Sequence, residues 1–147
     1  MFYVRGVVET VKKLRWDPTL VHASGWVSAL APIYLKRVYS DDPSFRNSKV
    51  VYSVFDDKFD GTLDPRMEEK LKMEGFTDED LKSISSAPVD YVALNKLAID
   101  YSDGVIQASP EIDPEILNYI KESGKPFLPY PGETEYIDKY AEFYNSL

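Results

Sequence analysis

The sequence predicts a three-layer α/β fold, in which a parallel sheet of three or four strands carries helices on both faces. Short apolar runs rich in β-branched residues recur at 20–22, 49–55 and 105–107. Segments of helical periodicity separate these runs, as in units where a helix crosses between two parallel strands. Proline, glycine and aspartate mark the boundaries between the two kinds of segment.

The first third of the chain contains a helix, a strand and a second helix. Apolar residues cover one side of the first segment, and Asp17-Pro18 marks its end because proline cannot continue a helix. Ser24 is expected to cap the second helix, and Pro32 is expected to kink it. The predicted bounds are 2–15 for the first helix, 20–22 for the strand and 25–37 for the second helix.

The middle of the chain begins with a strand and continues into helices. The stretch KVVYSVF is rich in β-branched and aromatic residues, which is typical of a buried strand. Asp64 followed by Pro65 indicates one helix start, and Thr77 with Asp80 forms a capping-box-like start for another. The predicted bounds are 49–55 for the strand, 65–73, 78–84 and 89–101 for the helices, and 85–88 for a loop.

The last third repeats the pattern of strand and helix. Asp113 before Pro114 indicates a helix start, and Gly124 is suited to end that helix. The final helix carries aromatic residues on one side, which we expect to pack onto the sheet of the same chain; a homodimer contact is the alternative. The predicted bounds are 105–107 for a strand, 114–122 for a helix, 125–128 for an edge strand, and Thr134 onward for the last helix.

Composition limits the classes of partner. The length suits a single domain over 1–147. Lysine and arginine number 17 against 25 acidic residues, and this net charge of −8 argues against nucleic acid or an anionic membrane. Without cysteine and with one histidine, neither a disulfide nor a metal centre is expected. No run approaches the ~20 apolar residues of a membrane span, and no signal-peptide pattern is present, so we expect a cytoplasmic protein.

A turn of small residues after the first strand is the candidate binding edge. Ligands of open α/β sheets bind beyond the carboxyl ends of the strands. His22 and Trp26 flank the Ser24-Gly25 turn at such a position, where an imidazole and an indole can contact a ligand. The residues alone favour a simpler interpretation, in which His22 bonds nearby backbone and Trp26 belongs to the core.

An acidic turn follows the second strand. Asp56, Asp57 and Asp60 have the composition of a divalent-ion loop. The EF-hand pattern fails, because glycine is missing at the sixth loop position and glutamate at the twelfth. A solvated acidic turn is therefore favoured, and no residue is assigned to a metal.

Three stretches stand in order along the chain: WDPTLVHASGWVSALAPIYLK, KVVYSVFDDKFDG and KLAIDYSDGVIQASPEIDPEI. Together, in this order and spacing, they resemble the N-terminal catalytic domain of bacterial glycogen and starch synthases, which are glycosyltransferases of the two-domain GT-B type. The resemblance runs from about residue 3 to residue 117. It implies that the chain is the later part of that Rossmann-like N-terminal domain.

The resemblance also implies a function, the transfer of glucose from a nucleotide sugar to an α-1,4-glucan. Val27 and Phe55 stand where the family has histidines, and Asp56 stands where it has asparagine. The family's phosphate-cradling loop and second domain have no counterpart in these residues. We therefore expect a fragment that is not active on its own, with no catalytic residue and no cofactor assigned. The substrate-binding residues expected are His22, Ser24, Gly25, Trp26 and Asp56.

A second hypothesis comes from a different functional class. The chain can instead be a non-catalytic module that binds glucan or associates with itself as a homo-oligomer. Under the first hypothesis, the nucleotide sugar and the α-glucan are partners of the intact parent protein.

Overall fold

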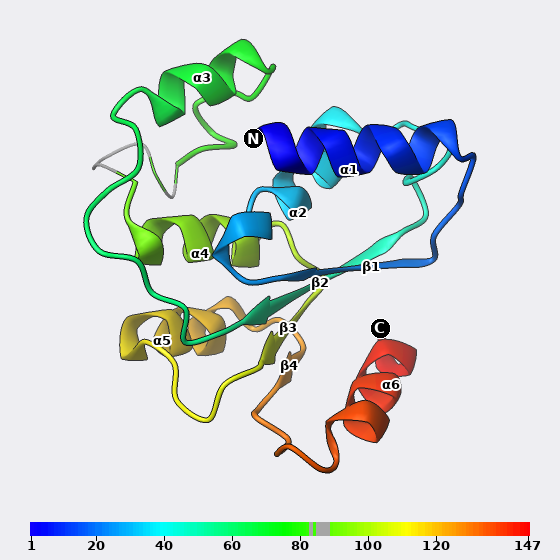
Figure 1. Ribbon diagram of the computed structural model, residues 1–147, viewed down its shortest axis with the longest axis vertical. Helices are drawn as coiled ribbons and strands as arrows, with labels where there is room; N and C mark the ends of the chain where they lie inside the picture. The colour runs from blue at the N-terminus through cyan, green and yellow to red at the C-terminus, as the bar shows by residue number, and fades with distance from the viewer. Residues whose placement is uncertain (83, 85–88) are drawn as a thin grey trace.

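Four parallel strands form one sheet in the order β1-β2-β3-β4 (Figure 1). The computed structural model describes residues 1–82, 84 and 89–147. The elements are α1 (Phe2–Lys13), β1 (Leu20–Ser24), η1 (Trp26–Ser28), α2 (Ala31–Ile33), η2 (Tyr34–Val38), β2 (Lys49–Val54), α3 (Met67–Met73), α4 (Tyr91–Asp100), β3 (Gly104–Gln107), α5 (Pro114–Ser123), β4 (Phe127–Leu128) and α6 (Tyr136–Ser146).

The helices that link successive strands lie on the same side of the sheet. The strands lie side by side in chain order, so each connection moves one strand further in the same direction. Because such connections between parallel strands have the same hand, their helices all lie on the same face of the sheet. The main core is on this side. Val50 and Tyr52 of β2 and Val105 of β3 pack there against side chains of α1, α2, α4 and α5.

The opposite face of the sheet is covered by α6. Alternate strand residues, Val51 and Ile106, point to this side and pack against Phe143 of the helix. Figure 1 shows α6, in red, on the side of the strands away from α1. The predicted three-layer arrangement with helices on both faces is thus confirmed, with the second helical layer formed by the last helix.

The predicted strands are present with small changes in length. β1 extends two residues beyond the predicted 20–22, and β4 occupies two residues of the predicted 125–128. The helix signals of the last third are also confirmed. The Asp113 side chain accepts a hydrogen bond from the Glu115 N–H, and Gly124 ends α5 with a positive φ of 69°.

The helix predicted over 25–37 is not a single α-helix. It divides into the 3₁₀ turn η1, the single α-turn α2 and the π-turn η2. Pro32 has no N–H with which to continue the hydrogen bonds of the first turn. The Tyr39 N–H then donates to the Tyr34 carbonyl, five residues back, at 3.0 Å. The kink expected at Pro32 is therefore a change of helix type.

The helix predicted over 78–84 is wrong for its described residues, which form turns. The capping-box contacts do form: the Thr77 N–H donates to Asp80, and the Asp80 N–H donates to the Thr77 hydroxyl. The capping contacts alone therefore do not produce a helix in this segment. The loop predicted over 85–88 lies outside the described residues.

Candidate functional site

The loops after β1 and β2 meet at the carboxyl edge of the sheet, and Asp57 joins them. Its Oδ2 accepts a hydrogen bond from the Trp26 backbone N–H at 3.2 Å. Its Oδ1 accepts one from the Tyr91 hydroxyl at 2.9 Å, and that hydroxyl also lies 2.6 Å from the Phe55 carbonyl. Burial and the Asp57 charge raise the pKa of Tyr91, which keeps its hydroxyl a donor.

Gly25 is required by the close approach of this carboxylate. Its φ is 75°, and a Cβ at this position would lie 2.8 Å from Asp57 Oδ2. The Gly25 N–H donates to the Ser53 carbonyl at 3.2 Å, which extends the pairing of β1 and β2 by one bond. A side chain here would be strained at this φ and would push the Asp57 carboxylate away.

Ser24 does not cap the following turn, contrary to the sequence prediction. The 3₁₀ turn η1 begins at Trp26, and the capping position is Gly25, with no cap from a serine side chain. Instead, the Ser24 carbonyl accepts a hydrogen bond from the Ser28 hydroxyl at 2.9 Å. The Asp57 carboxylate, from the loop after β2, takes the capping role at the Trp26 N–H.

The indole of Trp26 packs against the core. Its ring centroid lies 4.7 Å from that of Phe59, and the residue is partly buried against the main hydrophobic cluster. This placement agrees with the structural interpretation of Trp26 given by its position on an apolar helix side. The part of Trp26 that is not buried lines a hollow of about 260 Å³ together with Val27 and Leu30.

Asp56 lies at the exposed rim of the same edge. Its backbone N–H donates to the Ser109 hydroxyl in the loop after β3, at 2.9 Å. A hollow of about 170 Å³ adjoins it, lined in part by Lys58, Tyr91 and Asp113. Lys58 Nζ lies 3.8 Å from the Asp113 carboxylate. Carboxylates and an ammonium group in a small hollow can hydrogen-bond the hydroxyl groups of a sugar, whereas their net negative charge opposes a diphosphate.

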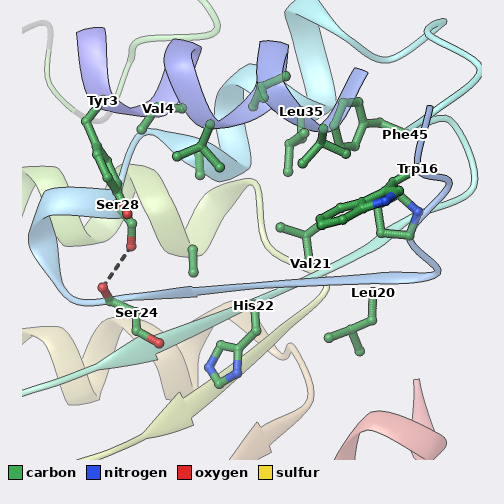
Figure 2. Close-up of a pocket in the computed structure, with 16 residues that line it drawn as sticks. Tyr3, Val4, Trp16, Leu20, Val21, His22, Ser24, Ser28, Leu35 and Phe45 are labelled. Carbon is green, nitrogen blue, oxygen red and sulfur yellow. Dashed lines mark hydrogen bonds between the residues drawn. The ribbon is translucent and has the colours of Figure 1, made fainter. Parts of the chain in front are cut away.

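His22 lies on a different side of the strand. Its imidazole points to the α6 face, away from α1 (Figure 2). Nε2 lies 2.5 Å from the Ser53 hydroxyl, and Nδ1 lies 2.5 Å from the Tyr144 hydroxyl. Burial lowers the pKa of His22 and favours the neutral ring.

The structure therefore places Gly25, Trp26 and Asp56 in the loops at the carboxyl ends of β1 and β2, where Asp57 contacts the first two, and it turns the His22 side chain toward α6. Sequence reasoning considered Asp57 only as part of an acidic turn, and it missed Tyr91. The available signal was that Asp57 lies in the short acidic stretch just after a buried strand, three residues beyond the end of β2. Among the residues that the structure describes, no cluster of three or more histidine or acidic side chains could hold a metal ion.

The sequence of the chain matches a known protein family. Residues 1–126 match the model of the starch synthase catalytic domain. The glycogen synthase of Clostridium perfringens is 30% identical over 115 residues, which are 78% of this chain and 23% of that protein. The glycogen synthase of Thermotoga petrophila is 36% identical over 66 residues, 45% of this chain and 14% of that protein.

A solved structure agrees on the fold. The catalytic domain of starch synthase IV from Arabidopsis thaliana, bound to ADP and acarbose, superposes with a TM-score of 0.64 at 17% identity. The match covers 87% of this chain and 28% of that one. The chain thus spans about a quarter of the glycogen synthase of Clostridium perfringens and of this structure. With its four-stranded parallel sheet and its match over 1–126, the chain belongs to the starch synthase catalytic domain family.

Proposed function

We propose that this chain is part of a glucosyltransferase of the glycogen synthase type, which transfers glucose from a nucleotide sugar to an α-1,4-glucan. The observation that carries the proposal is the family match over 1–126, on a parallel sheet whose loops meet at the carboxyl ends of the strands. The starch synthase IV structure that shares the fold is bound to ADP and acarbose. A nucleotide and a glucan-like sugar are therefore the ligand classes proposed for the intact parent protein.

We propose further that the chain alone does not transfer glucose. Transfer from a nucleotide sugar requires groups that stabilise the departing diphosphate. At the edge described above, the Trp26 N–H is taken by Asp57, and the exposed side chains are mostly acidic. Val27 and Phe55 occupy the positions of the family histidines, and both are exposed side chains that cannot donate a hydrogen bond.

A chimera tests the proposal. The matched 115 residues of the Clostridium perfringens glycogen synthase are replaced by the corresponding residues of this chain. Transfer of labelled glucose to glycogen is measured with ADP-glucose and with UDP-glucose. Restoring the two histidines with Val27→His and Phe55→His is expected to raise transfer by about tenfold or more, because positioned donors stabilise the transition state.

The matched control is Val38→His, which adds a histidine at an exposed valine outside the edge. It is expected to leave transfer by the chimera unchanged. A chimera that folds, carries both restored histidines and still transfers no glucose would refute the catalytic part of the proposal. Glucose transfer by the unmodified chain on its own would refute the claim that it is inactive alone.

The location and assembly of the protein are also proposals. The helices in the described parts of the chain include none both long and apolar enough to cross a membrane. The glycogen synthase relatives support a cytoplasmic location, which cell fractionation tests. Homo-oligomer formation is tested by light scattering over a range of protein concentrations.

The second candidate function, binding of glucan without catalysis, relies on α6. Tyr136 is 45% exposed, and its ring lies 5.7 Å from that of Tyr140. Exposed tyrosine rings can stack on sugars. Retardation of the chain in a glycogen gel, lost in Tyr136→Ala, would favour this function. Unchanged mobility would remove it.

A further inference from the structure

Three tyrosines of α6, which we call the tyrosine row, lie in line and end at His22 of β1. The row consists of Tyr136, Tyr140 and Tyr144, which share one side of the helix because they recur every four residues. Ring centroids lie 5.7 Å apart for Tyr136 and Tyr140 and 6.3 Å apart for Tyr140 and Tyr144. The imidazole centroid of His22 lies 5.6 Å from that of Tyr144.

The tyrosine row has an outer end in solvent and a protected inner end. Tyr136 is 45% exposed at the outer end. Tyr140 and Tyr144 are partly buried, and Ser53, on the far side of the imidazole, is 1% exposed. The row therefore leads from the surface of the molecule to a set of shielded polar groups.

The hydrogen bonds at the inner end have a preferred direction. The Tyr144 hydroxyl lies 2.5 Å from Nδ1 of His22, and the Ser53 hydroxyl lies 2.5 Å from Nε2. A phenol is a stronger acid than an aliphatic alcohol, so Tyr144 is the better donor and Ser53 the better acceptor. This difference assigns the ring proton to Nε2. The Tyr144 O–H then donates to Nδ1, and the Nε2–H donates to Ser53 Oγ.

This arrangement suits the removal of one electron from Tyr144. Burial raises the pKa of the Tyr144 phenol, so the group keeps its proton at neutral pH. A phenol that loses an electron becomes a very strong acid and must release that proton. Burial lowers the pKa of His22, which keeps the ring neutral, with Nδ1 already in contact with the Tyr144 hydroxyl. A neutral imidazole is a far stronger base than an oxidised phenol, so the proton has an immediate acceptor.

We propose that Tyr144 and His22 form a redox-active pair, to which the tyrosine row connects a one-electron oxidant at the protein surface, such as a peroxyl radical. The electron passes from Tyr144 to the oxidant by way of Tyr140 and Tyr136. The proton passes from the Tyr144 oxygen to His22 Nδ1. The products are a neutral tyrosyl radical at Tyr144, an imidazolium at His22 and the oxidant reduced by one electron. The net charge of −8 on the chain favours the new cation.

The test oxidises the full chain with photogenerated ruthenium(III) tris(bipyridine), a one-electron oxidant. EPR spectroscopy of samples frozen after illumination measures the tyrosyl radical that persists. The unmodified chain is expected to give this signal, and Tyr144→Phe is expected to lose most of it. Tyr3→Phe is the matched control, because it removes a tyrosine that is 58% exposed on α1 and lies outside the row. It is expected to keep the signal.

Two further variants separate the base from the row. His22→Gln keeps a side chain that can hydrogen-bond but removes the base, so oxidation of Tyr144 is expected to slow. Hydrogen exchange in α6 checks that the helix stays in place. Tyr136→Phe interrupts the row at its exposed end and is expected to lower the yield of the Tyr144 radical.

One measurement needs no variant. Because a proton moves with the electron, formation of the radical in the unmodified chain is expected to be slower in deuterated water, as followed by transient absorption. Absence of this isotope effect, a signal unchanged in Tyr144→Phe, or equally fast oxidation in His22→Gln would overturn the redox-active pair. A yield unchanged in Tyr136→Phe would overturn the role of the tyrosine row.

Discussion

The imidazole Nδ1 of His22 lies 2.5 Å from the hydroxyl oxygen of Tyr144, although the two residues are 122 positions apart. On the other side of the ring, Nε2 lies 2.5 Å from the hydroxyl of Ser53, a residue that is 1% exposed. This chain of hydrogen bonds joins β2, β1 and α6. Among the residues that the structure describes, α6 is the helix that covers this face of the sheet, so these contacts bear directly on how that helix is held.

Removal of the Tyr144 hydroxyl tests this link. Tyr144→Phe keeps the ring but leaves a partly buried imidazole nitrogen without its partner, so the free energy of unfolding is expected to fall by about 1–3 kcal/mol. Urea denaturation measures the change. Tyr136→Phe on the exposed side of α6 is the control and is expected to stay within about 0.5 kcal/mol of the unmodified chain. Equal effects of the two substitutions would show that the His22 contact does not hold the helix.

The same contact predicts a dependence on pH. Burial lowers the pKa of His22 in the folded chain, so below about pH 6.5 the unfolded chain binds a proton that the folded chain resists. The free energy of unfolding is therefore expected to decrease as the pH falls through this value toward the lower, folded-state pKa. Urea titrations at a series of pH values measure it. His22→Gln, which does not titrate, is expected to lose this part of the slope, and a slope unchanged in the variant would contradict the prediction.

The strands could be predicted from the sequence because the apolar, β-branched residues of each run indicate a buried strand. KVVYSVF is apolar on both sides, and five of the six residues of β2 are buried. Alternation with helices then indicates parallel pairing, since parallel strands need a crossover. The predicted order of elements and the α/β class therefore required no knowledge of distant contacts.

The candidate site could be predicted only in part, because its contacts are distant in the sequence. Gly25 and Trp26 form a recognisable turn. Asp57, however, contacts Trp26 across 31 positions of sequence and contacts Tyr91 across 34 positions. Nothing local to His22 indicates Tyr144. Alternation along β1 decides that the imidazole faces α6, and the sequence alone does not reveal which face that helix covers.

Asp103 lies just before β3, at the amino ends of the strands, and its carboxylate links β2 to η2. Its Oδ2 accepts hydrogen bonds from Lys36 Nζ at 2.7 Å and from the Val50 N–H at 2.8 Å. Burial opposes its charge, but these two donors outweigh burial and lower the pKa of Asp103. Asp103→Ala is expected to lower the free energy of unfolding by about 1.5–3 kcal/mol, measured in urea at neutral pH.

The control for Asp103 is Asp78→Ala, which removes an exposed ion pair with Lys72. An exposed pair contributes about 0–1 kcal/mol, so this change is expected to be small. Because the folded-state pKa of Asp103 is lowered, its stabilising contribution is present above the unfolded-state pKa and is lost as the pH falls through the folded value. An Asp103→Ala effect no larger than that of Asp78→Ala would contradict the assigned role.

Lys125 closes the end of α4. Its Nζ donates to the carbonyls of Ile99 at 2.7 Å, Asp100 at 2.6 Å and Ser102 at 2.7 Å. Lys125→Met keeps much of the aliphatic chain but removes the ammonium donor, while the Ile99 carbonyl still accepts from the Ser102 N–H; a loss of about 1–3 kcal/mol is expected in urea unfolding. Lys121→Met, at an exposed position of α5, is the control and is expected to have little effect. Similar losses in both variants would argue against the carbonyl contacts.

Gly104 at the start of β3 tests how closely α6 packs on the sheet. A Cβ there would lie 2.9 Å from the tip of the Phe143 ring and 3.1 Å from a Leu147 methyl group, so one of them must move. Gly104→Ala is expected to lower the free energy of unfolding by about 1–3 kcal/mol, because it overpacks this contact.

Gly6→Ala is the matched control: it has open space within α1 and is expected to stabilise the chain by about 0.5–1 kcal/mol, since alanine favours a helix. Urea unfolding measures both, and hydrogen exchange in α6 locates the effect. A Gly104→Ala protein as stable as the unmodified chain, with α6 equally protected, would show that Phe143 and Leu147 adjust without loosening the helix.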